Sequence, residues 1–210
     1  MYNTAREKLC TFLHAKGASP DEAERYQHTR DEELKKTYGY SACRFARSFE
    51  DTVLHLYQSA STDDIRYARS LALEVFETKA TPVDGLQQLL AALRQHYMLG
   101  ILTAGERWVQ DKRLREFPFI NDFQATEIVA SKTAKILRNF CDNHRVRPEK
   151  SWVVGDSVSS DIRPALEAGF QAVHLRVENW SQGEGVGTIN GVPQISQLSD
   201  LLRVPGLLPE

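Results

Sequence analysis

The sequence predicts an α/β protein in which a parallel β-sheet carries helices on both faces and is preceded by a segment made only of helices. Residues 1–80 show helical periodicity and no strand pattern. From Pro82 onward, short apolar runs alternate with amphipathic segments of about ten residues or more. Apolar runs spaced in this way are typical of parallel strands covered on both faces. We therefore expect two domains, residues 1–80 and residues 81–210.

Four helices are expected in residues 1–80. Gly17 is placed to end the first helix, and a very polar second helix ends near Lys36. The segment Ser19-Pro20-Asp21-Glu22 is interpreted as a capping box with proline in the first turn, and the acids after Ser61 suit the start of the fourth helix. Apolar residues recur at helical spacing and predict the core of a bundle: Tyr2, Ala5, Leu9, Phe12, Leu13, Phe45, Phe49, Val53, Leu56, Tyr57, Ile65, Ala68, Leu71, Val75 and Phe76.

The second part alternates helix and strand. Strands are expected within residues 97–103, 123–130, 151–155 and 171–177. Helices are expected within residues 83–96, 106–116, 133–144, 161–168 and 198–202, with a surface loop at 179–190.

Composition excludes several classes of protein. The 26 basic and 28 acidic residues of the 210 leave a net charge of -2 without a basic cluster, which argues against a nucleic-acid partner. No apolar run approaches the roughly 20 residues of a membrane span. Cys10, Cys43 and Cys141 lack metal-ligand spacing and indicate a reducing compartment, and the first residues show no signal-peptide core. We therefore expect a cytoplasmic protein without a membrane partner; the sequence sets no oligomeric state.

Polar residues follow three of the predicted strands, at the edge of the sheet where α/β proteins bind ligands. Thr103-Ala104-Gly105 offers a hydroxyl and backbone N–H groups that suit phosphate, or Thr103 is an ordinary helix cap. Lys132 follows the next strand, where a lone lysine is most often a surface residue. Asp156 and Asp161 follow Gly155 and suit Mg²⁺, or they are a turn aspartate and a helix cap.

The three loops together resemble the haloacid dehalogenase-like (HAD) hydrolase superfamily. ILTAG resembles the strand that ends in the family's phosphate-binding Ser or Thr, and EIVASKTAKILRNF resembles the segment that carries its motif lysine. WVVGDSVSSDIRPALEAGF is similar to the family's metal-binding turn. The four-helix segment is similar to the helical cap of one large subgroup. The resemblance covers nearly the whole chain and implies a Rossmann-like core with a cap.

The resemblance also implies a phosphatase site. In the family, an aspartate attacks the phosphoryl group to form an aspartyl-phosphate, which water hydrolyses, and a second aspartate acts as acid and base. Carried over, Thr103, Ala104 and Gly105 would hold phosphate, Lys132 would neutralise the transferring group, and Asp156 and Asp161 would hold Mg²⁺. The implied substrate is a small phosphorylated metabolite.

The sequence departs from the family at its first motif, Asp-x-Asp at the end of an apolar strand. No Asp-x-Asp occurs in the 210 residues. In the family this strand lies between those that here end at Thr103 and Gly155, so its absence would leave buried peptide groups unpaired at about 1–3 kcal/mol each. Either those neighbours pair directly or another segment enters; residues 188–196 are the candidate, although they resemble an edge element more.

Three interpretations follow. In the first, the protein is an Mg²⁺-dependent phosphatase and the sequence lacks a starting segment of roughly 10–20 residues. In the second, it is an inactive HAD-like binding or regulatory module that still holds phosphate at Thr103 and Lys132. In the third, it is an unrelated flavodoxin-like or nucleotide-binding protein, although the glycine-rich loops of nucleotide sites are absent. Arg44, Arg47 and Tyr57 are candidates for substrate contacts from the cap.

Overall fold

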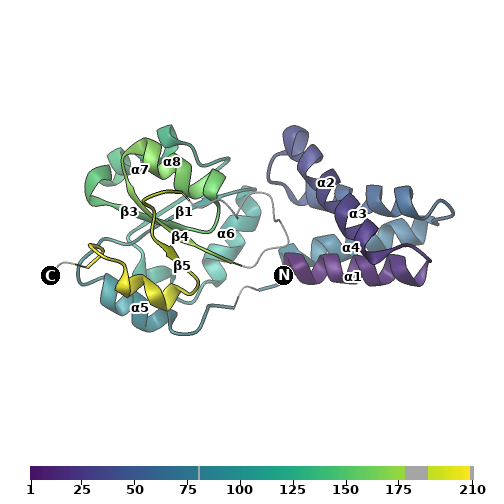
Figure 1. Ribbon diagram of the computed structural model, residues 1–210, viewed down its shortest axis with the longest axis horizontal. Coiled ribbons are helices and arrows are strands. Elements are labelled where there is room, and N and C mark those ends of the chain that lie inside the picture. Colours follow the sequence, from purple (N-terminus) through teal and green to yellow (C-terminus); the bar gives the residue numbers. More distant parts are fainter. Residues whose placement is uncertain (80, 178–188, 209–210) are drawn as a thin grey trace. The chain divides into compact units, whose positions relative to one another are not determined.

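The computed structural model describes residues 1–79, 81–177 and 189–208. The chain divides into two compact units, Met1–Lys79 (unit 1) and Ala80–Glu210 (unit 2). Figure 1 shows that unit 1 is helical and that the strands lie in unit 2. The α/β class with parallel strands, predicted from the sequence, is confirmed. Within the described ranges, no helix is both long enough and apolar enough to cross a membrane.

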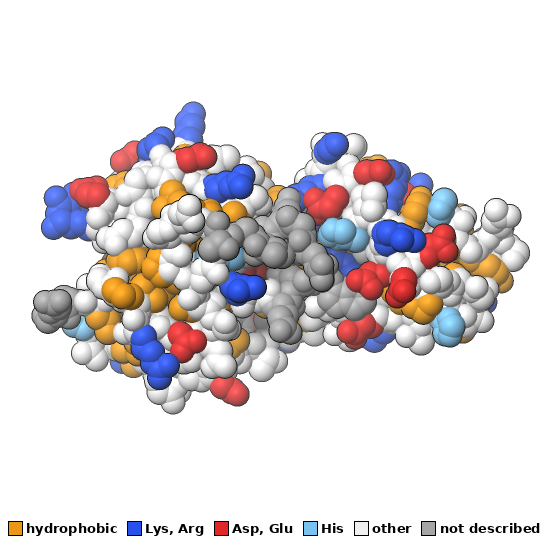
Figure 2. Space-filling model, in the orientation of Figure 1, with side chains coloured by type: hydrophobic (Ala, Val, Ile, Leu, Met, Phe, Trp, Pro, Cys, Tyr) orange, Lys and Arg blue, Asp and Glu red, His pale blue; other side chains and the backbone are white. Residues whose placement is uncertain are grey.

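Unit 1 contains the four expected helices: α1 (Tyr2–Ala15), α2 (Pro20–Tyr38), α3 (Ala42–Leu56) and α4 (Thr62–Glu77). Helix α3 packs against both α2 and α4, and α1 packs against α2 and α4. Leu9, Leu13, Phe45, Phe49 and Val53 are almost completely buried, as their helical spacing predicts. Figure 2 shows acidic and basic side chains interspersed over the visible face of unit 1, with no stripe of one sign.

The two predicted helix starts differ in outcome. At α4, Ser61 and Asp64 form a complete capping box, in which each side chain accepts from the other residue's backbone N–H. At α2, the side chain of Ser19 makes no capping hydrogen bond, so the capping box predicted there is wrong. Proline at the start and acids in the first turn fix that end of α2 instead, through the fixed φ of proline and the helix dipole.

Charged side chains are buried between the helices of unit 1. Asp31 on α2 is 4% exposed and lies between Arg44 (Nε–Oδ1 3.2 Å) and Arg6 (Nη2–Oδ2 3.8 Å). Arg6 also donates to Gln27, which donates to Ser48. Burial raises the pKa of Asp31 and lowers the pKa of Arg6. This network of buried polar side chains joins α1, α2 and α3. Loss of one member would leave another buried polar group without a partner.

Unit 2 alternates strands and helices in the predicted order. The elements are α5 (Leu86–Leu93), β1 (Gly100–Ala104), α6 (Arg107–Glu116), the 3₁₀ turn η1 (Ile120–Asp122), β2 (Ala125–Val129), α7 (Ala134–His144), the 3₁₀ turn η2 (Pro148–Lys150), β3 (Trp152–Gly155), the π-helical turn η3 (Val158–Ile162), α8 (Arg163–Ala168), β4 (Gln171–Leu175), β5 (Gln194–Ile195) and the 3₁₀ helix η4 (Leu198–Arg203). Most of the loop predicted at 179–190 lies outside the described residues.

The strands form two parallel sheets. Strand β1 pairs with β2 from Gly100↔Ala125 to Ala104↔Val129, and β3, β4 and β5 form the second sheet in that order. Strand β5 pairs with the outer side of β4, so this part of residues 188–196 is the edge element that the sequence suggested. Within the described residues, no backbone hydrogen bond joins β1 to β3.

One helical layer covers both sheets. Helix α7 packs on β2, α8 packs on β4, and the two helices pack on each other; Figure 1 shows both helices along the same side of the strands. Leu102 of β1 and Val153 of β3 contact one apolar cluster built from α7, α8 and β4. A second cluster lies on the other side, between β4, β5, α5 and η4. The two sheets therefore lie side by side between layers of helix.

The turn after β3 is wider than an α-helical turn. The sequence predicts a helix from about Asp161, but the structure begins earlier with η3 and continues into α8. Ile162 N–H donates to the carbonyl of Ser157, five residues back, at 3.1 Å. Short π-helical turns of this kind often occur at functional sites.

Candidate functional site

Lys132 and Asp161 meet at the carboxyl ends of the strands. Lys132 lies in the loop between β2 and α7, and its Nζ is 2.6 Å from Oδ1 of Asp161 on η3. The side chains are 23% and 7% exposed, respectively, so the lysine reaches solvent while the carboxylate does not. The other oxygen, Oδ2, accepts from the backbone N–H of Ser157 at 3.0 Å. The pair therefore joins the loops that follow β2 and β3.

Gly155 is required by the position of Asp161. A Cβ atom on Gly155 would lie 2.4 Å from Cβ of Asp161 and 2.5 Å from its Cγ, well inside van der Waals contact. Asp161 can cover the end of β3 only because residue 155 has no side chain. The sequence Gly-Asp after the apolar run therefore has a steric reason, in addition to the carboxylate that follows.

Asp156 lies in the same loop, directly after Gly155. It is exposed, and within the described residues its side chain has no hydrogen bond or ion pair. Its backbone carbonyl lies 3.3 Å from Nε2 of His174, a residue of β4 that is 2% exposed. The buried ring of His174 thus contacts the backbone of Asp156, while the carboxylate of Asp156 stays open to solvent.

The groups around Thr103 are engaged within the protein. Thr103 Oγ1 donates to Oε1 of Gln110 on α6 at 2.8 Å. Gly105 N–H donates to the carbonyl of Val129 at 3.1 Å, which extends the β1–β2 ladder by one residue. Gly105 has a φ of 139°, and a Cβ there would be 2.9 Å from Nε2 of Gln110. Of the predicted phosphate donors, the Gly105 N–H is occupied in this structure, and Thr103 would have to exchange its Gln110 contact to bind a ligand.

Candidate donors for a metal ion are present only in part. Carboxylate oxygens are the donors that Mg²⁺ prefers, and Asp156 fits that role because its side chain is open. Asp161 is held by Lys132 and Ser157, so it suits support of a metal site better than direct ligation. Among the described residues, no group of three or more His, Cys, Asp or Glu side chains could hold a metal ion. The described residues thus fit a metal site that needs a further carboxylate.

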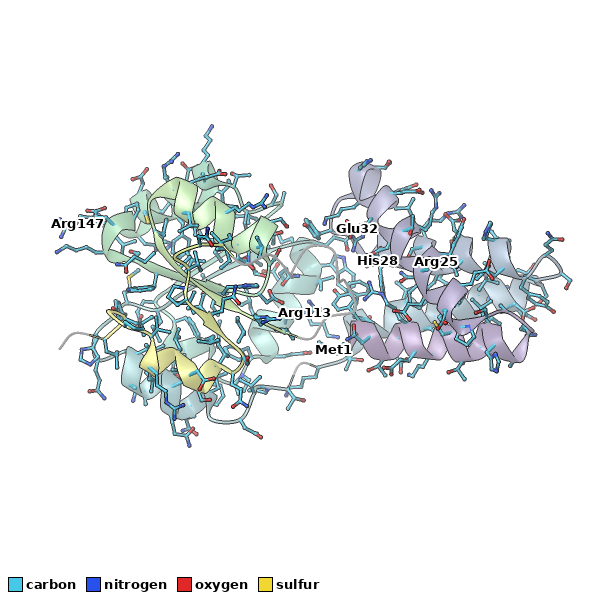
Figure 3. The ribbon with its side chains drawn as sticks, in the orientation of Figure 1. Met1, Arg25, His28, Glu32, Arg113 and Arg147 are labelled. Atoms are coloured by element: carbon cyan, nitrogen blue, oxygen red, sulfur yellow. The ribbon has the colours of Figure 1, made fainter. Side chains whose placement is uncertain are left out.

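Arg113 of α6, labelled in Figure 3, is a further cation of unit 2. Its Nε and Nη2 atoms are buried and lack hydrogen-bond partners in the part of the chain that the structure describes. It lies one turn beyond the buried Val109, on a helix that packs against β2. Arg113 carries no sequence signal, because a helix rich in lysine and arginine does not show which of its cations is buried.

The structure thus brings together Lys132 and Asp161, with Asp156 in the short loop between β3 and η3, and places Thr103 in a contact with Gln110 instead. Three contacts of the site were not predicted from the sequence. The side-chain amide of Gln110 accepts from Thr103, the backbone N–H of Ser157 donates to Asp161, and the buried ring of His174 contacts the carbonyl of Asp156. The motif spacing carries no signal for the first two. A histidine in an otherwise apolar strand was the available signal for the third.

The cap residues suggested as substrate contacts have partners inside unit 1. Arg44 is buried against Asp31, and Arg47 pairs with Asp51 at 2.9 Å and with Glu50 at 3.4 Å. The ring of Tyr57 lies 5.1 Å from Nζ of Lys16. Their roles toward a substrate stay predictions.

Parallel strands between two helical layers, with a lysine–aspartate pair and a free aspartate at the carboxyl strand ends, define an α/β protein whose charged groups gather where such folds bind ligands. The family model described as "Haloacid dehalogenase-like hydrolase" matches residues 18–175, and the chain belongs to this family.

Curated relatives include enzymes of phosphorylated compounds. Pyrimidine 5'-nucleotidase YjjG of Escherichia coli is 29% identical over 128 residues, which cover 58% of this chain and 57% of the relative. N-acylneuraminate-9-phosphatase of Mus musculus is 27% identical over 131 residues, which cover 60% of this chain and 51% of the relative. The matched region therefore spans about half the length of these relatives.

Solved structures share the fold. A haloacid dehalogenase-like hydrolase from Xanthomonas campestris superposes with a TM-score of 0.77 at 16% identity, covering 95% of this chain and 80% of that one. The HAD-hydrolase YfnB of Bacillus subtilis, in a form bound to magnesium, superposes with a TM-score of 0.68 at 17% identity, covering 97% and 92%. At these identities the likeness concerns the fold alone.

Proposed function

We propose that this chain forms the larger part of an Mg²⁺-dependent phosphatase for a small phosphorylated metabolite. The observation that carries the proposal is the contact between Lys132 Nζ and Asp161 Oδ1 at 2.6 Å, beside the open carboxylate of Asp156. Its contact with Asp161 fixes the ammonium group of Lys132 at the carboxyl ends of the strands, where it could bind a phosphoryl group. The nucleotidase and phosphatase relatives support this class of substrate.

Each residue has a separate role in this proposal. Lys132 keeps two donors beyond its contact with Asp161 and would neutralise the phosphoryl oxygens. Thr103, released from Gln110, and the N–H of Ala104 would hold another oxygen. Asp156 would bind Mg²⁺ directly, with Asp161 supporting it through the loop. When bound, Mg²⁺ supplies positive charge that stabilises the transferring phosphoryl group.

The nucleophile would be an aspartate on a segment outside residues 1–210. Its carboxylate oxygen bonds to phosphorus as the bond to the leaving alkoxide breaks, and the alkoxide takes a proton from a neighbouring acid. Water then cleaves the aspartyl-phosphate to inorganic phosphate and restores the carboxylate. Unit 1 would serve as the helical cap domain of the family. Residues 1–210 alone would bind a phosphate ester without turning it over.

Two measurements test the proposal. The intact mass of the protein from its own source should exceed the 23.8 kDa of these 210 residues by about one strand and a connection. That full protein should hydrolyse p-nitrophenyl phosphate only with Mg²⁺, and Asp156→Asn should lower kcat by at least a hundredfold with an unchanged fold. Equal turnover by the Asp156 variant would remove this residue from the metal site.

The second candidate is a binding module without turnover. It is favoured by the contacts of Thr103 with Gln110 and of Gly105 with Val129, which already satisfy two of the predicted phosphate donors. A module predicts a native protein of 23.8 kDa that hydrolyses no ester and binds inorganic phosphate through Lys132. Calorimetry with Lys132→Ala, compared with Lys135→Ala on the following helix, checks this role.

A further inference from the structure

The guanidinium group of Arg113, on α6 (Figure 3), carries buried donors that lack an acceptor. Its Nε and Nη2 atoms are buried, and neither has a hydrogen-bond partner in the described part of the chain. Arginine has donors only, and a buried donor without an acceptor destabilises a folded protein. Few buried polar groups of native proteins are left in this state, so each one calls for a specific explanation.

Gln110 offers an acceptor to Arg113. The two residues are three positions apart on α6, where side chains of neighbouring turns meet. Long side chains of a helix lean toward its N-terminus, so Arg113 leans toward the turn that carries Gln110. Val109, on the same turn, is apolar and buried. Gln110 Oε1 is therefore the side-chain oxygen that this turn can present to the guanidinium.

The same oxygen of Gln110 is engaged by Thr103. The hydroxyl Oγ1 of Thr103 donates to Oε1 at 2.8 Å. The amide also lies against Gly105, where a Cβ atom would be 2.9 Å from Nε2. A hydroxyl has one proton to donate, and the proposed function assigns that of Thr103 to phosphate. In this arrangement Thr103 is closed to a ligand, and Arg113 on the next turn has no acceptor.

We propose that Gln110 is a positioning residue that exchanges partners: it accepts from Thr103 when the site is empty and from Arg113 when phosphate is bound. This inference rests on the proposed function, because it needs a phosphate oxygen that accepts from Thr103. Gln110 Oε1 then loses its donor and turns to the unpaired donors of Arg113. The protein keeps the same number of internal hydrogen bonds, and the guanidinium gains an acceptor only in the occupied site.

The exchange lowers the free-energy cost of opening Thr103 to the ligand. Without Arg113, phosphate would take the Thr103 hydroxyl from Gln110 and leave the amide oxygen without a donor. One side-chain hydrogen bond changes an equilibrium constant about three- to tenfold, so loss of Arg113 should weaken phosphate by this factor. Loss of Gln110 as well should restore the affinity, because Thr103 then has no partner to give up.

A double-mutant cycle tests the exchange. The probe is inorganic phosphate, which is titrated into residues 1–210 and followed by isothermal titration calorimetry. Arg113→Met should weaken binding about three- to tenfold, whereas Gln110→Leu and the double variant should bind within about twofold of the unchanged chain. Arg115→Met, the matched control, removes an exposed charge from the same helix and should also stay within about twofold.

The cycle separates the exchange from other roles of Arg113. A double variant that binds as weakly as Arg113→Met would mean that the guanidinium acts on phosphate without Gln110, and it would overturn the exchange. Equal binding by Arg113→Met and the unchanged chain would do the same. Without phosphate, Arg113→Met removes unpaired buried donors and should keep or raise Tm. A fall of more than about 4 °C would show a structural arginine and contradict the proposal.

Failure of the proposed function gives a different result. Lys132→Ala should abolish phosphate binding in the unchanged chain and in the variants of α6. Phosphate binding that needs Lys132 but is unaffected by the variants at Gln110 and Arg113 would keep the phosphate site and overturn the exchange alone. No phosphate binding by the unchanged chain would overturn both.

Discussion

The pair Lys132–Asp161 should contribute strongly to the stability of unit 2, and a double-mutant cycle measures how much. Lys132→Met leaves a carboxylate that is 7% exposed and that keeps, among the described residues, one donor, the N–H of Ser157. Removal of one partner from a buried pair costs about 3–5 kcal/mol, and the partial exposure of the lysine lowers our expectation to about 2–4 kcal/mol. Asp161→Asn leaves a lysine that is 23% exposed and can turn to water, at about 1–2 kcal/mol.

The coupling energy between the two sites should be about 1.5–3 kcal/mol, the range for hydrogen bonds to charged groups. The assay is urea unfolding followed by tryptophan fluorescence. Trp108 and Trp152 belong to unit 2 and the sequence of residues 1–79 contains no tryptophan, so the signal reports on the unit that carries the pair.

A matched control comes from the same unit. Arg94 Nη1 lies 3.1 Å from Asp122 Oδ1, joins two elements at a similar sequence separation, and has side chains that are 57% and 24% exposed. Its coupling should fall below about 1 kcal/mol, as for other surface pairs. A value for Lys132–Asp161 no larger than that of the control would refute the view that this contact fixes the two loops.

Three further outcomes are expected. Gly155→Ala should destabilise unit 2 by about 2–4 kcal/mol in the same urea assay, because a Cβ 2.4 Å from that of Asp161 must displace the carboxylate. In unit 1, hydrogen bonds from the Ser61 side chain and backbone N–H, and the Lys16 ammonium, lower the pKa of Asp64 to about 2. Asp64→Asn should therefore lower Tm at pH 7, and the difference should shrink as pH falls from about 4, the unfolded value, toward the folded pKa. Burial raises the pKa of Cys141 and that of Cys10, the latter to about 11, so a thiol reagent near pH 8 should label only the exposed Cys43 quickly.

Each outcome has a result that contradicts it. An alanine variant at Gly155 with unchanged urea midpoint would mean that Asp161 moves freely. A Tm difference at Asp64 that is constant from pH 7 to about pH 3 would show that its carboxylate does not stabilise the cap of α4. Fast modification of three thiols in the folded protein would contradict the burial of Cys10 and Cys141.

The sequence predicted the strands best where a short, mostly apolar run is bounded by loops. Residues 151–155 and 171–175 are apolar runs bounded by loops, and their period leaves few alternatives to buried parallel strands. The meeting of Lys132 with Asp161 also follows from sequence, because parallel strands bring their following loops to one edge of the sheet. Both predictions depend on chain topology, which a regular pattern encodes.

Contacts that depend on the direction in which a side chain points could not be predicted from the sequence. Whether Thr103 faces an open pocket or Gln110 depends on the phase of α6, which a polar helix does not reveal. Ser19 has the composition of a capping residue, yet its hydroxyl makes no such bond. The sequence also left open whether β1 and β3 would pair, since a strand pattern specifies burial and not the neighbour.

The π-helical turn η3 sets the rotational phase of Asp161. In an α-helix each residue advances by about 100° around the axis. A turn that contains one residue more therefore rotates the side chains that follow it, relative to their directions in an α-helix. Deleting one exposed residue, such as Ser159, would convert the turn to ordinary spacing and swing the carboxylate away from Lys132. Two related chains that differ by one residue between Asp156 and Asp161 would therefore point this carboxylate in different directions. The effect of an insertion or deletion in this loop therefore depends on whether the turn that remains is α-helical or π-helical, because that sets the direction of the Asp161 carboxylate.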